Sequence, residues 1–218
     1  MIVFDILGTM VDEPGGIRRA IREIVPEVDD AAAAERWLRY VDEQQRDILA
    51  GRRPYAPSTV LDREAAALVA PGAPGVAGEL ADAALRLEPW PDSVAALDRI
   101  AARFPVVGLS NAGAAALTRI SAHAGLRWHQ LLSAERARTY KPAPEIYRLA
   151  IDNAGVAPDR LLMVAAHAWD LRGAQAAGMR TAYVARPVGD PPGPDDAFDL
   201  TATSLDDLAA QLETLGDS

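Results

Sequence analysis

Short apolar runs alternate with alanine-rich segments along much of this 218-residue chain. The runs have the length of strands that are buried on both faces, and the segments between the last four end at a glycine, as helices often do. Strands that alternate with helices predict βαβ units and a parallel sheet. The predicted strands are Ile2–Leu7, Pro105–Leu109, Leu131–Ala134, Leu161–Ala165 and Thr181–Ala185, and the helices between the last four are Ala112–Gly125, Pro144–Gly155 and Leu171–Gly178.

The pattern changes between the first predicted strand and Pro89. Four helical segments follow one another there, separated by proline and glycine residues. They predict a helical insertion, residues 13–88, that lies over the strand ends as a cap on a core of residues 1–12 and 89–218. The predicted cap helices are Ile17–Val25, Ala31–Leu49, Ser58–Val69 and Val76–Leu87, and Leu205–Leu215 is predicted to be a closing helix.

Composition narrows the classes of function. Half of the residues are hydrophobic and 24% are charged, which is the balance of a globular protein with a full core. The net charge is −9 and no cluster of Lys and Arg stands out, which argues against binding to nucleic acid. The chain has no cysteine, so thiolate metal sites, disulfides and cysteine nucleophiles are excluded. We find no signal segment and no run long enough to span a membrane, and expect a cytoplasmic protein.

Asp5 is the first candidate for chemistry. The apolar run Ile2–Phe4 brings its carboxylate to a strand end, and the turn Gly8–Thr9 follows. Ligands of open α/β sheets bind outside the carboxyl ends of the strands. An unpaired carboxylate is costly to bury, so one in this place favours a chemical role over packing.

Polar residues follow the next strands in the same way. Ser110 and Asn111 end the second, Lys141 comes before a helix that begins at a proline, and Asp170 follows the fourth with His167 three residues before it. Taken singly, Ser110, Asn111 and Asp170 fit helix N-caps, while Lys141 and His167 fit solvated surface residues. Their ordered occurrence at strand ends favours one shared site.

This ordered set resembles the four motifs of the haloacid dehalogenase superfamily, and the resemblance extends over nearly the whole chain. It implies a doubly wound, Rossmann-like core with a helical cap after the first strand. By the same resemblance Asp5 is a covalent nucleophile, Ser110 and Lys141 hold the anionic intermediate, and Asp170 acts beside them.

Two departures separate the branches of that superfamily. Its phosphatases resemble Asp-x-Asp at the first motif, where this chain has Leu7, and carry a further carboxylate where this chain has Ala166. A departing halide needs neither a general acid nor Mg²⁺, whereas a departing alkoxide needs a proton. The pattern of Asp5, Lys141 with Tyr147 six residues later, and Ala168-Trp169-Asp170 resembles the type II 2-haloacid dehalogenases.

Two more departures lie within that branch. Its characterised members resemble Ser-x-Asn at the positions of Ala165 and His167, and we expect His167 to orient or deprotonate the hydrolytic water. They also have a halide-binding Arg directly after a cap Trp, whereas Leu38 follows Trp37 here; Arg39 is one step, or 100°, further round a helix.

The sequence thus predicts a hydrolase that displaces halide from a small 2-haloalkanoic acid through an aspartyl ester, giving a 2-hydroxy acid. We expect a small-molecule substrate and no cofactor. The resemblance also suggests a homodimer. A Mg²⁺-dependent phosphatase and a hydrolase or binding protein for a non-halogenated substrate stay as alternatives. The catalytic residues are predicted to be Asp5, Lys141, Asp170 and His167, and the substrate-binding residues Thr9, Ser110, Asn111, Tyr147, Trp169 and Arg39.

Overall fold

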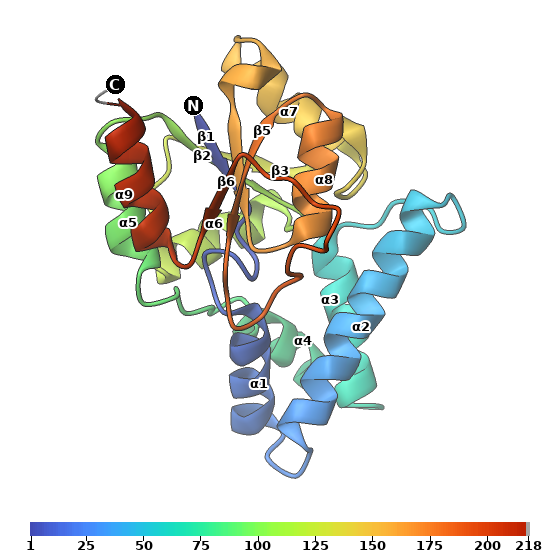
Figure 1. The fold of residues 1–218 in the computed structure, drawn as a ribbon. Helices are drawn as coiled ribbons and strands as arrows, with labels where there is room; N and C mark the ends of the chain where they lie inside the picture. Colours follow the sequence, from blue (N-terminus) through green and yellow to red (C-terminus); the bar gives the residue numbers. More distant parts are fainter. Residues whose placement is uncertain (217–218) are drawn as a thin grey trace.

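A six-stranded parallel sheet forms the centre of the computed structural model, which describes residues 1–216 (Figure 1). The strand order is β3-β2-β1-β4-β5-β6, which is that of a doubly wound, Rossmann-like sheet. The fold class predicted from the sequence is confirmed. The strands are β1 (Ile2–Phe4), β2 (Val106–Ser110), β3 (Gln130–Ser133), β4 (Leu162–Ala165), β5 (Arg180–Val184) and β6 (Leu200–Ala202).

Strand β1 lies in the middle of the sheet and is buried throughout. Val3 is in register with Val107 of β2 and with Met163 of β4. Because side chains alternate along a strand, Ile2 and Phe4 join the hydrophobic cluster on one face of the sheet, and Val3 joins the cluster on the other. The residue that follows β1 is thereby held at the centre of the carboxyl edge.

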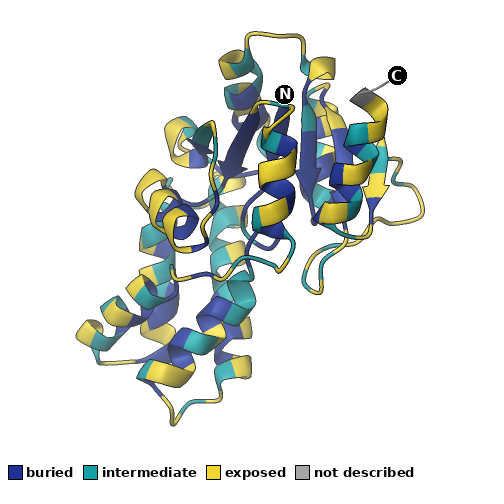
Figure 2. Cartoon of the chain, turned by 90° about the vertical axis from the view of Figure 1, so that its left-hand side faces the viewer, coloured by how far each residue is buried: buried dark blue, intermediate teal, exposed yellow. Residues whose placement is uncertain are grey.

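Helices cover both faces of the sheet (Figures 1 and 2). Helices α5 (Ser93–Ala101), α6 (Ala114–His123) and α9 (Leu205–Gly216) contribute to the cluster that contains Phe4. Helices α7 (Pro144–Ala154) and α8 (Ala168–Ala176) contribute to the cluster that contains Val3. The central strands β1 and β2 are accordingly dark blue, or buried, in Figure 2, while most helices carry a yellow exposed stripe. Two short 3-10 helices, η1 (Ala134–Ala137) and η2 (Pro158–Arg160), complete the core.

Four further helices pack against one another beyond the carboxyl edge of the sheet, at the bottom of Figure 1. They share a hydrophobic cluster of their own, in which Trp37 is fully buried. We call this group the helical unit. Its division from the core at residues 13 and 88, as the sequence suggests, stays a prediction. The helices are α1 (Glu13–Ile24), α2 (Asp30–Leu49), α3 (Ser58–Val69) and α4 (Pro74–Ala83).

Local sequence explains where several helices begin and end. Asp12 caps α1, because its Oδ1 accepts a hydrogen bond from the Gly15 N–H at 2.9 Å. Asp29 caps α2 through the N–H groups of Ala31 and Ala32. Gly155 ends α7 in a left-handed conformation with φ 62°, which a residue with a β-carbon adopts only at a cost.

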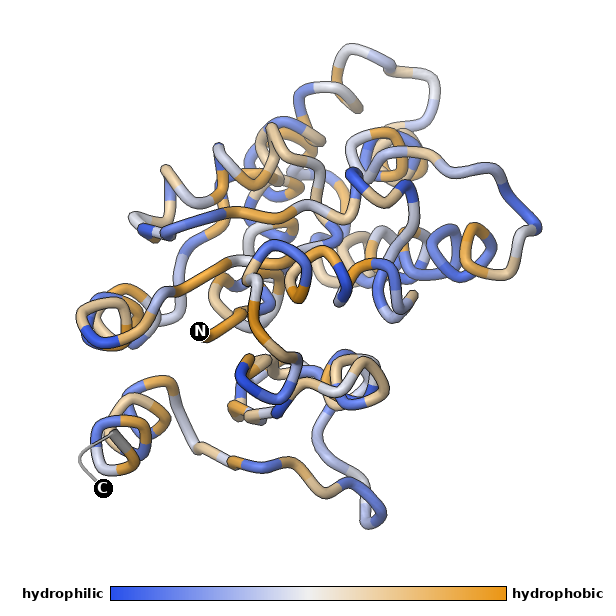
Figure 3. The backbone as a smooth tube through the Cα atoms, turned by 90° about the horizontal axis from the view of Figure 1, so that it is seen from above, coloured by the Kyte–Doolittle hydropathy of each residue, from blue (hydrophilic) through white to orange (hydrophobic). Residues whose placement is uncertain are grey.

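All five predicted strands and all eight predicted helices are present, with shifted ends. Helix α8 begins at Ala168 rather than Leu171, and α4 spans Pro74–Ala83 rather than Val76–Leu87. Sequence analysis missed α5 and β6, whose nine and three residues carry too little pattern to separate them from loops. In Figure 3, the first strand is coloured orange, or hydrophobic, whereas the helices alternate between hydrophobic and hydrophilic colours along their turns. None of the helices within residues 1–216 has the length and hydrophobicity that crossing a membrane requires.

Candidate active site

A cavity of about 300 Å³ opens at the carboxyl edge of the sheet, between the core and the helical unit. This edge, next to the central strand where the chain crosses from one half of the sheet to the other, is where open α/β folds bind ligands. The cavity is lined by Asp5, Leu7, Gly8, Glu13, Pro14, Leu38, Val41, Asp42, Gln45, Ser110, Asn111, Lys141, His167, Trp169, Val188 and Gly189.

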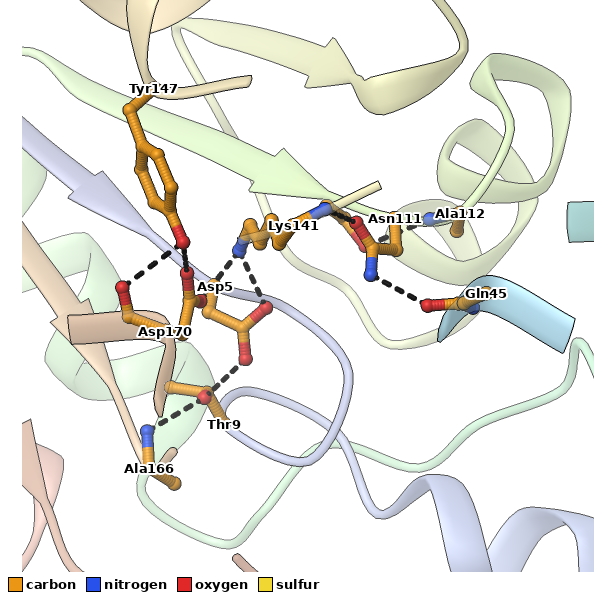
Figure 4. Close-up of polar contacts among 10 residues, drawn as sticks. Asp5, Thr9, Gln45, Asn111, Ala112, Lys141, Tyr147, Ala166 and Asp170 are labelled. Atoms are coloured by element: carbon orange, nitrogen blue, oxygen red, sulfur yellow. Dashed lines mark hydrogen bonds and ion pairs between the residues drawn. The ribbon is translucent and has the colours of Figure 1, made fainter. Parts of the chain in front are cut away.

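Asp5 lies at the floor of this cavity. Its backbone N–H donates to the Val164 carbonyl oxygen at 2.9 Å, which continues the β1–β4 ladder by one residue. The Thr9 hydroxyl donates to Asp5 Oδ2 at 2.6 Å and accepts from the Ala166 N–H at 2.9 Å (Figure 4). The Asp5 side chain is therefore held in one orientation while it still faces the cavity.

Lys141 bridges two carboxylates. Its Nζ lies 3.0 Å from Asp5 Oδ1 and 2.7 Å from Asp170 Oδ2, and its side chain is almost fully buried (Figure 4). Burial alone would lower the pKa of Lys141, but the charges of Asp170 and Asp5 outweigh it and raise this pKa above its ordinary value. The ammonium thus stays charged at neutral pH and neutralises part of the negative charge around Asp5.

Asp170 is fully buried behind Lys141 and does not line the cavity. Burial raises the pKa of its carboxyl, and the bonds from Lys141 and Tyr147 oppose that rise. The Tyr147 hydroxyl donates to Asp170 Oδ1 at 2.7 Å. A β-carbon at Gly173 would overlap the Tyr147 hydroxyl, so the glycine makes room for this contact. Asp170 and Tyr147 consequently position Lys141 from below.

Asn111 connects three segments of the site. Its Oδ1 accepts from the Lys141 backbone N–H at 2.8 Å, and its Nδ2 donates to Gln45 Oε1 on α2 at 2.9 Å. Ser110 lies beside it in the cavity, and the Ser110 hydroxyl accepts from the Ala112 N–H at 3.2 Å. These side chains place hydroxyl and amide groups at the end of β2, near Asp5.

His167 and Trp169 form another wall of the cavity. Their rings stack with centroids 5.8 Å apart, and the backbone N–H of Trp169 donates to Asp190 Oδ2 at 3.1 Å. A β-carbon at Gly8 would lie 2.7 Å from His167 Nε2, and the Gly8 φ of 77° is one that glycine adopts most easily. The imidazole therefore lies against the turn that follows Asp5.

One face of α2 supplies the opposite wall. Leu38, Val41, Asp42 and Gln45 recur at the three- and four-residue spacing of a helix face and line the cavity together. Arg39 lies outside this face.

The structure brings together six of the ten predicted site residues around the cavity: Asp5, Ser110, Asn111, Lys141, His167 and Trp169. It places three others, which the sequence suggests as substrate-binding residues, away from the cavity. Thr9 and Tyr147 are fully buried behind the wall, where they hydrogen-bond to carboxylates rather than face a ligand. Arg39 is exposed and pairs with Glu35 at 3.4 Å, because the 100° step from Leu38 turns it towards solvent.

Sequence analysis missed Glu13 and Gln45, which line the cavity from α1 and α2. Helical periodicity from Leu38 points to Gln45, whereas nothing in the local pattern singles out Glu13. Within residues 1–216, no three His, Asp or Glu side chains gather closely enough to hold a metal ion.

Comparison with known proteins agrees with this geometry. The family model of haloacid dehalogenase-like hydrolases matches residues 1–178. The (S)-2-haloacid dehalogenase H-109 of Pseudomonas putida is 33% identical over 111 residues, and that of Pseudomonas sp. (strain YL) is 36% identical over 112 residues. These matches cover 50% and 49% of this chain and 50% and 47% of the relatives, so the chain spans about half the length of the curated relatives it matches.

Similarity to solved structures extends over almost the whole chain. A defluorinating L-2-haloacid dehalogenase superposes with a TM-score of 0.89 at 33% identity, covering 97% of this chain and 94% of that one. The L-2-haloacid dehalogenase of Xanthobacter autotrophicus with chloropropionic acid covalently bound has a TM-score of 0.84 at 26% identity, with 97% of each chain covered. From its sequence and its structure alike, the chain belongs to the haloacid dehalogenase-like hydrolase family.

Proposed function

We propose that this protein hydrolyses small 2-haloalkanoic acids to 2-hydroxy acids through an ester formed on Asp5. The observation that carries the proposal is the setting of Asp5. Its carboxylate faces the cavity, held by Thr9 and Lys141, while the residue two positions later is the apolar Leu7. A nucleophile is thus present without a neighbouring acid, which suits a leaving group that needs no proton.

In the first step, an Asp5 carboxylate oxygen attacks the carbon that bears the halogen. The bond from that oxygen to the carbon forms as the carbon–halogen bond breaks, and the halide leaves with the electron pair. The substrate carboxylate is held by backbone N–H groups after Asp5 together with Ser110 and Asn111, which line the same cavity. Fixing both partners in this way removes much of the entropic cost of the encounter.

In the second step, water attacks the carbonyl carbon of the ester. His167 is placed to accept the proton of that water, because it lines the cavity next to the turn that follows Asp5. Lys141 stabilises the oxyanion from its position 3.0 Å from Asp5 Oδ1, and Asp170 holds Lys141 in place. Collapse of the intermediate restores Asp5 and releases the 2-hydroxy acid.

Two positions favour this reaction over Mg²⁺-dependent phosphate transfer. Leu7 cannot protonate an alkoxide, and Ala166 offers no carboxylate to a metal, so the reaction is proposed to need no cofactor. The relatives named (S)- or L-2-haloacid dehalogenase support the substrate class and the S configuration, and the chloropropionic acid covalently bound in one of them supports an enzyme-bound intermediate.

The helical unit is proposed to act as the cap of this site. Besides the contact between Asn111 and Gln45, hydrogen bonds near the cavity join it to the core. The Tyr140 hydroxyl donates to the Ala56 carbonyl oxygen at 2.6 Å, and the Gly113 N–H donates to Ser58 Oγ at 2.9 Å. A cap held in this way restricts water to the molecules needed for ester hydrolysis.

Halide release from the two enantiomers of 2-chloropropionate tests the proposal. We expect halide release from the S enantiomer, and this rate should not change when excess chelator is added. The Asp5→Asn variant should release no halide. The opposite outcome is hydrolysis of a generic phosphoester that chelator abolishes and Mg²⁺ restores. That result would replace this proposal with the Mg²⁺-dependent phosphatase.

A further inference from the structure

The side of the cavity that faces Asp5 has no cationic side chain. In the part of the chain that the structure describes, residues 1–216, this side is lined by Pro14, Leu38, Val41, Asp42, Glu13 and Gln45. An in-line displacement sends the leaving group away from its nucleophile, so a halide displaced by Asp5 departs towards these residues. A departing anion needs a hydrogen-bond donor or a positive charge there.

Most of these residues cannot serve. Pro14, Leu38 and Val41 have no polar side-chain atom. The Asp42 side chain is exposed at the rim of the cavity, where it already accepts a hydrogen bond from Arg46 Nε at 3.2 Å. Lys141 supplies the buried ammonium of the site, but it lies against Asp5 on the nucleophile side. Glu13 and Gln45 are left as the groups that can donate.

Glu13 is the first residue of α1 and half-buried in the wall of the cavity. No side chain within residues 1–216 is hydrogen-bonded or ion-paired to its carboxyl, although it also lines an adjoining cavity of about 50 Å³ together with Asp62 and Trp37. A carboxyl without a cationic partner, between two other carboxylates, is poorly placed to carry a charge.

The charges around Glu13 support a protonated carboxyl. Burial raises the pKa of Glu13 to about 8, and the carboxylates of Asp62 on α3 and Asp5 after β1 add to that rise. Lys141, His167 and Asp42 line the same cavity, and the carboxylate of a bound haloacid would bring one more negative charge. Glu13 therefore carries an O–H at neutral pH.

We propose that Glu13, through its carboxyl O–H, donates the hydrogen bond that receives the departing halide, in place of a cationic side chain. This inference rests on the proposed function and assigns a catalytic residue to it. Because fluoride is the most basic of the halides and accepts the strongest hydrogen bonds, the arrangement extends the substrate class to 2-fluoroalkanoic acids.

The step balances without a further reagent. The Asp5 oxygen forms its bond to the substrate carbon, the halide leaves with the electron pair of the broken bond, and Glu13 keeps its proton while it shares it with the halide. Hydrolysis of the ester then releases one proton to solvent along with the 2-hydroxy acid. Ionised Glu13 would instead repel the halide, so the step weakens as the pH rises through about 8.

The test compares fluoride, chloride and bromide release from the matched 2-halopropionates by wild type, Glu13→Gln and Glu13→Ala. Glu23→Gln, an exposed carboxyl on the same helix, is the control. We expect Glu13→Ala to slow fluoride release by about 10²–10³-fold, the usual cost of one lost donor, and bromide release by less than about tenfold. Glu13→Gln keeps a donor and should retain fluoride release.

The pH profile separates a chemical role from a structural one. Wild-type fluoride release should fall as the pH rises through about 8, and Glu13→Gln should remove that fall, since an amide does not ionise. Three results would each overturn the inference. The first is that Glu13→Ala slows the release of all three halides equally. The second is a wild-type rate of fluoride release that does not change with pH in this range, and the third is a wild type that releases bromide but no fluoride. No halide release from any substrate would instead overturn the proposed function.

Discussion

Asn111 Nδ2 donates to Gln45 Oε1 at 2.9 Å, which ties the end of β2 to helix α2 across the cavity. The same Asn111 side chain accepts from the Lys141 backbone N–H at 2.8 Å through its Oδ1 (Figure 4). One amide therefore links the helical unit, the end of β2 and the backbone of Lys141. Its orientation is fixed by both partners, because the oxygen and the nitrogen of the amide are each engaged.

Loss of the Gln45 partner should loosen this arrangement. We expect Gln45→Ala to lower kcat/KM for 2-chloropropionate by about tenfold, the worth of one hydrogen bond, mostly through a higher KM. Steady-state kinetics measure the effect, with Glu43→Ala on the exposed side of α2 as the control. An equal loss in both variants would mean that α2 is disturbed as a whole and that the Asn111 contact has no special role.

Asp5→Asn should abolish halide release with little change in the thermal melting temperature, because the amide keeps the shape and an acceptor oxygen, and Lys141 keeps its ion pair with Asp170. A single turnover of wild type in water labelled with heavy oxygen should give unlabelled product, since the new oxygen comes from the carboxylate. Later turnovers should give labelled product. Label in the product of the first turnover would show direct attack by water and contradict the ester.

Asp62 is expected to limit stability at neutral pH. Burial raises its pKa to about 6 from 3.8, although a hydrogen bond from Trp37 Nε1, at 3.3 Å, favours the charged form. The folded protein thus holds this proton more tightly than the unfolded chain, so stability is full below 3.8 and falls as the pH rises through about 6.

Asp62→Asn keeps the acceptor for Trp37 and removes the ionisation. It should stabilise the protein above pH 6 by about 3 kcal/mol, the worth of about two pKa units, or about 6–12 °C in Tm, and have little effect at pH 4. Melting curves across this range measure the difference, with Glu79→Gln, an exposed carboxyl of α4, for comparison. The same gain at pH 4 would show that the charge is not the cause.

The predicted site residues that line the cavity are mostly those whose position follows from strand ends. Asp5, Ser110 and His167 come within two residues of a buried parallel strand, so the sheet alone brings them to one edge. Lys141 is brought there by the loop before α7, and the motif resemblance, not periodicity, pointed to it.

The predicted residues that lie away from the cavity, and the lining residue that the sequence did not point to, have a different origin. Thr9 and Tyr147 lie near the site in sequence, but whether a side chain faces the cavity or the core depends on packing that one segment does not encode. For Glu13, burial raises the pKa, and the cavity beside it is closed by residues of α2, α3 and α4 and by residues after β2, which are far away in the sequence. Arg39 was placed by its charge, although the helical period already turned it away from Leu38.

His167 is expected to control the second half of the reaction. Both carboxylate oxygens of Asp170 are engaged, one with Lys141 Nζ at 2.7 Å and the other with the Tyr147 hydroxyl at 2.7 Å, and the residue has no access to the cavity. Asp170 is therefore poorly placed to take a proton from water. The imidazole of His167 faces the cavity beside Gly8 and is the remaining base next to the ester.

His167→Ala should then slow ester hydrolysis by about 10²–10⁴-fold, the usual contribution of a general base, and leave ester formation nearly unchanged. Mass spectrometry after addition of substrate should show the acyl chain on a peptide that contains Asp5, together with one early burst of halide. His123→Ala serves as the control, because that imidazole lies on the surface beside Glu88, 3.1 Å from its carboxylate. Normal turnover by His167→Ala, or a failure before any adduct forms, would assign His167 to the cavity wall or to substrate binding instead of to proton transfer.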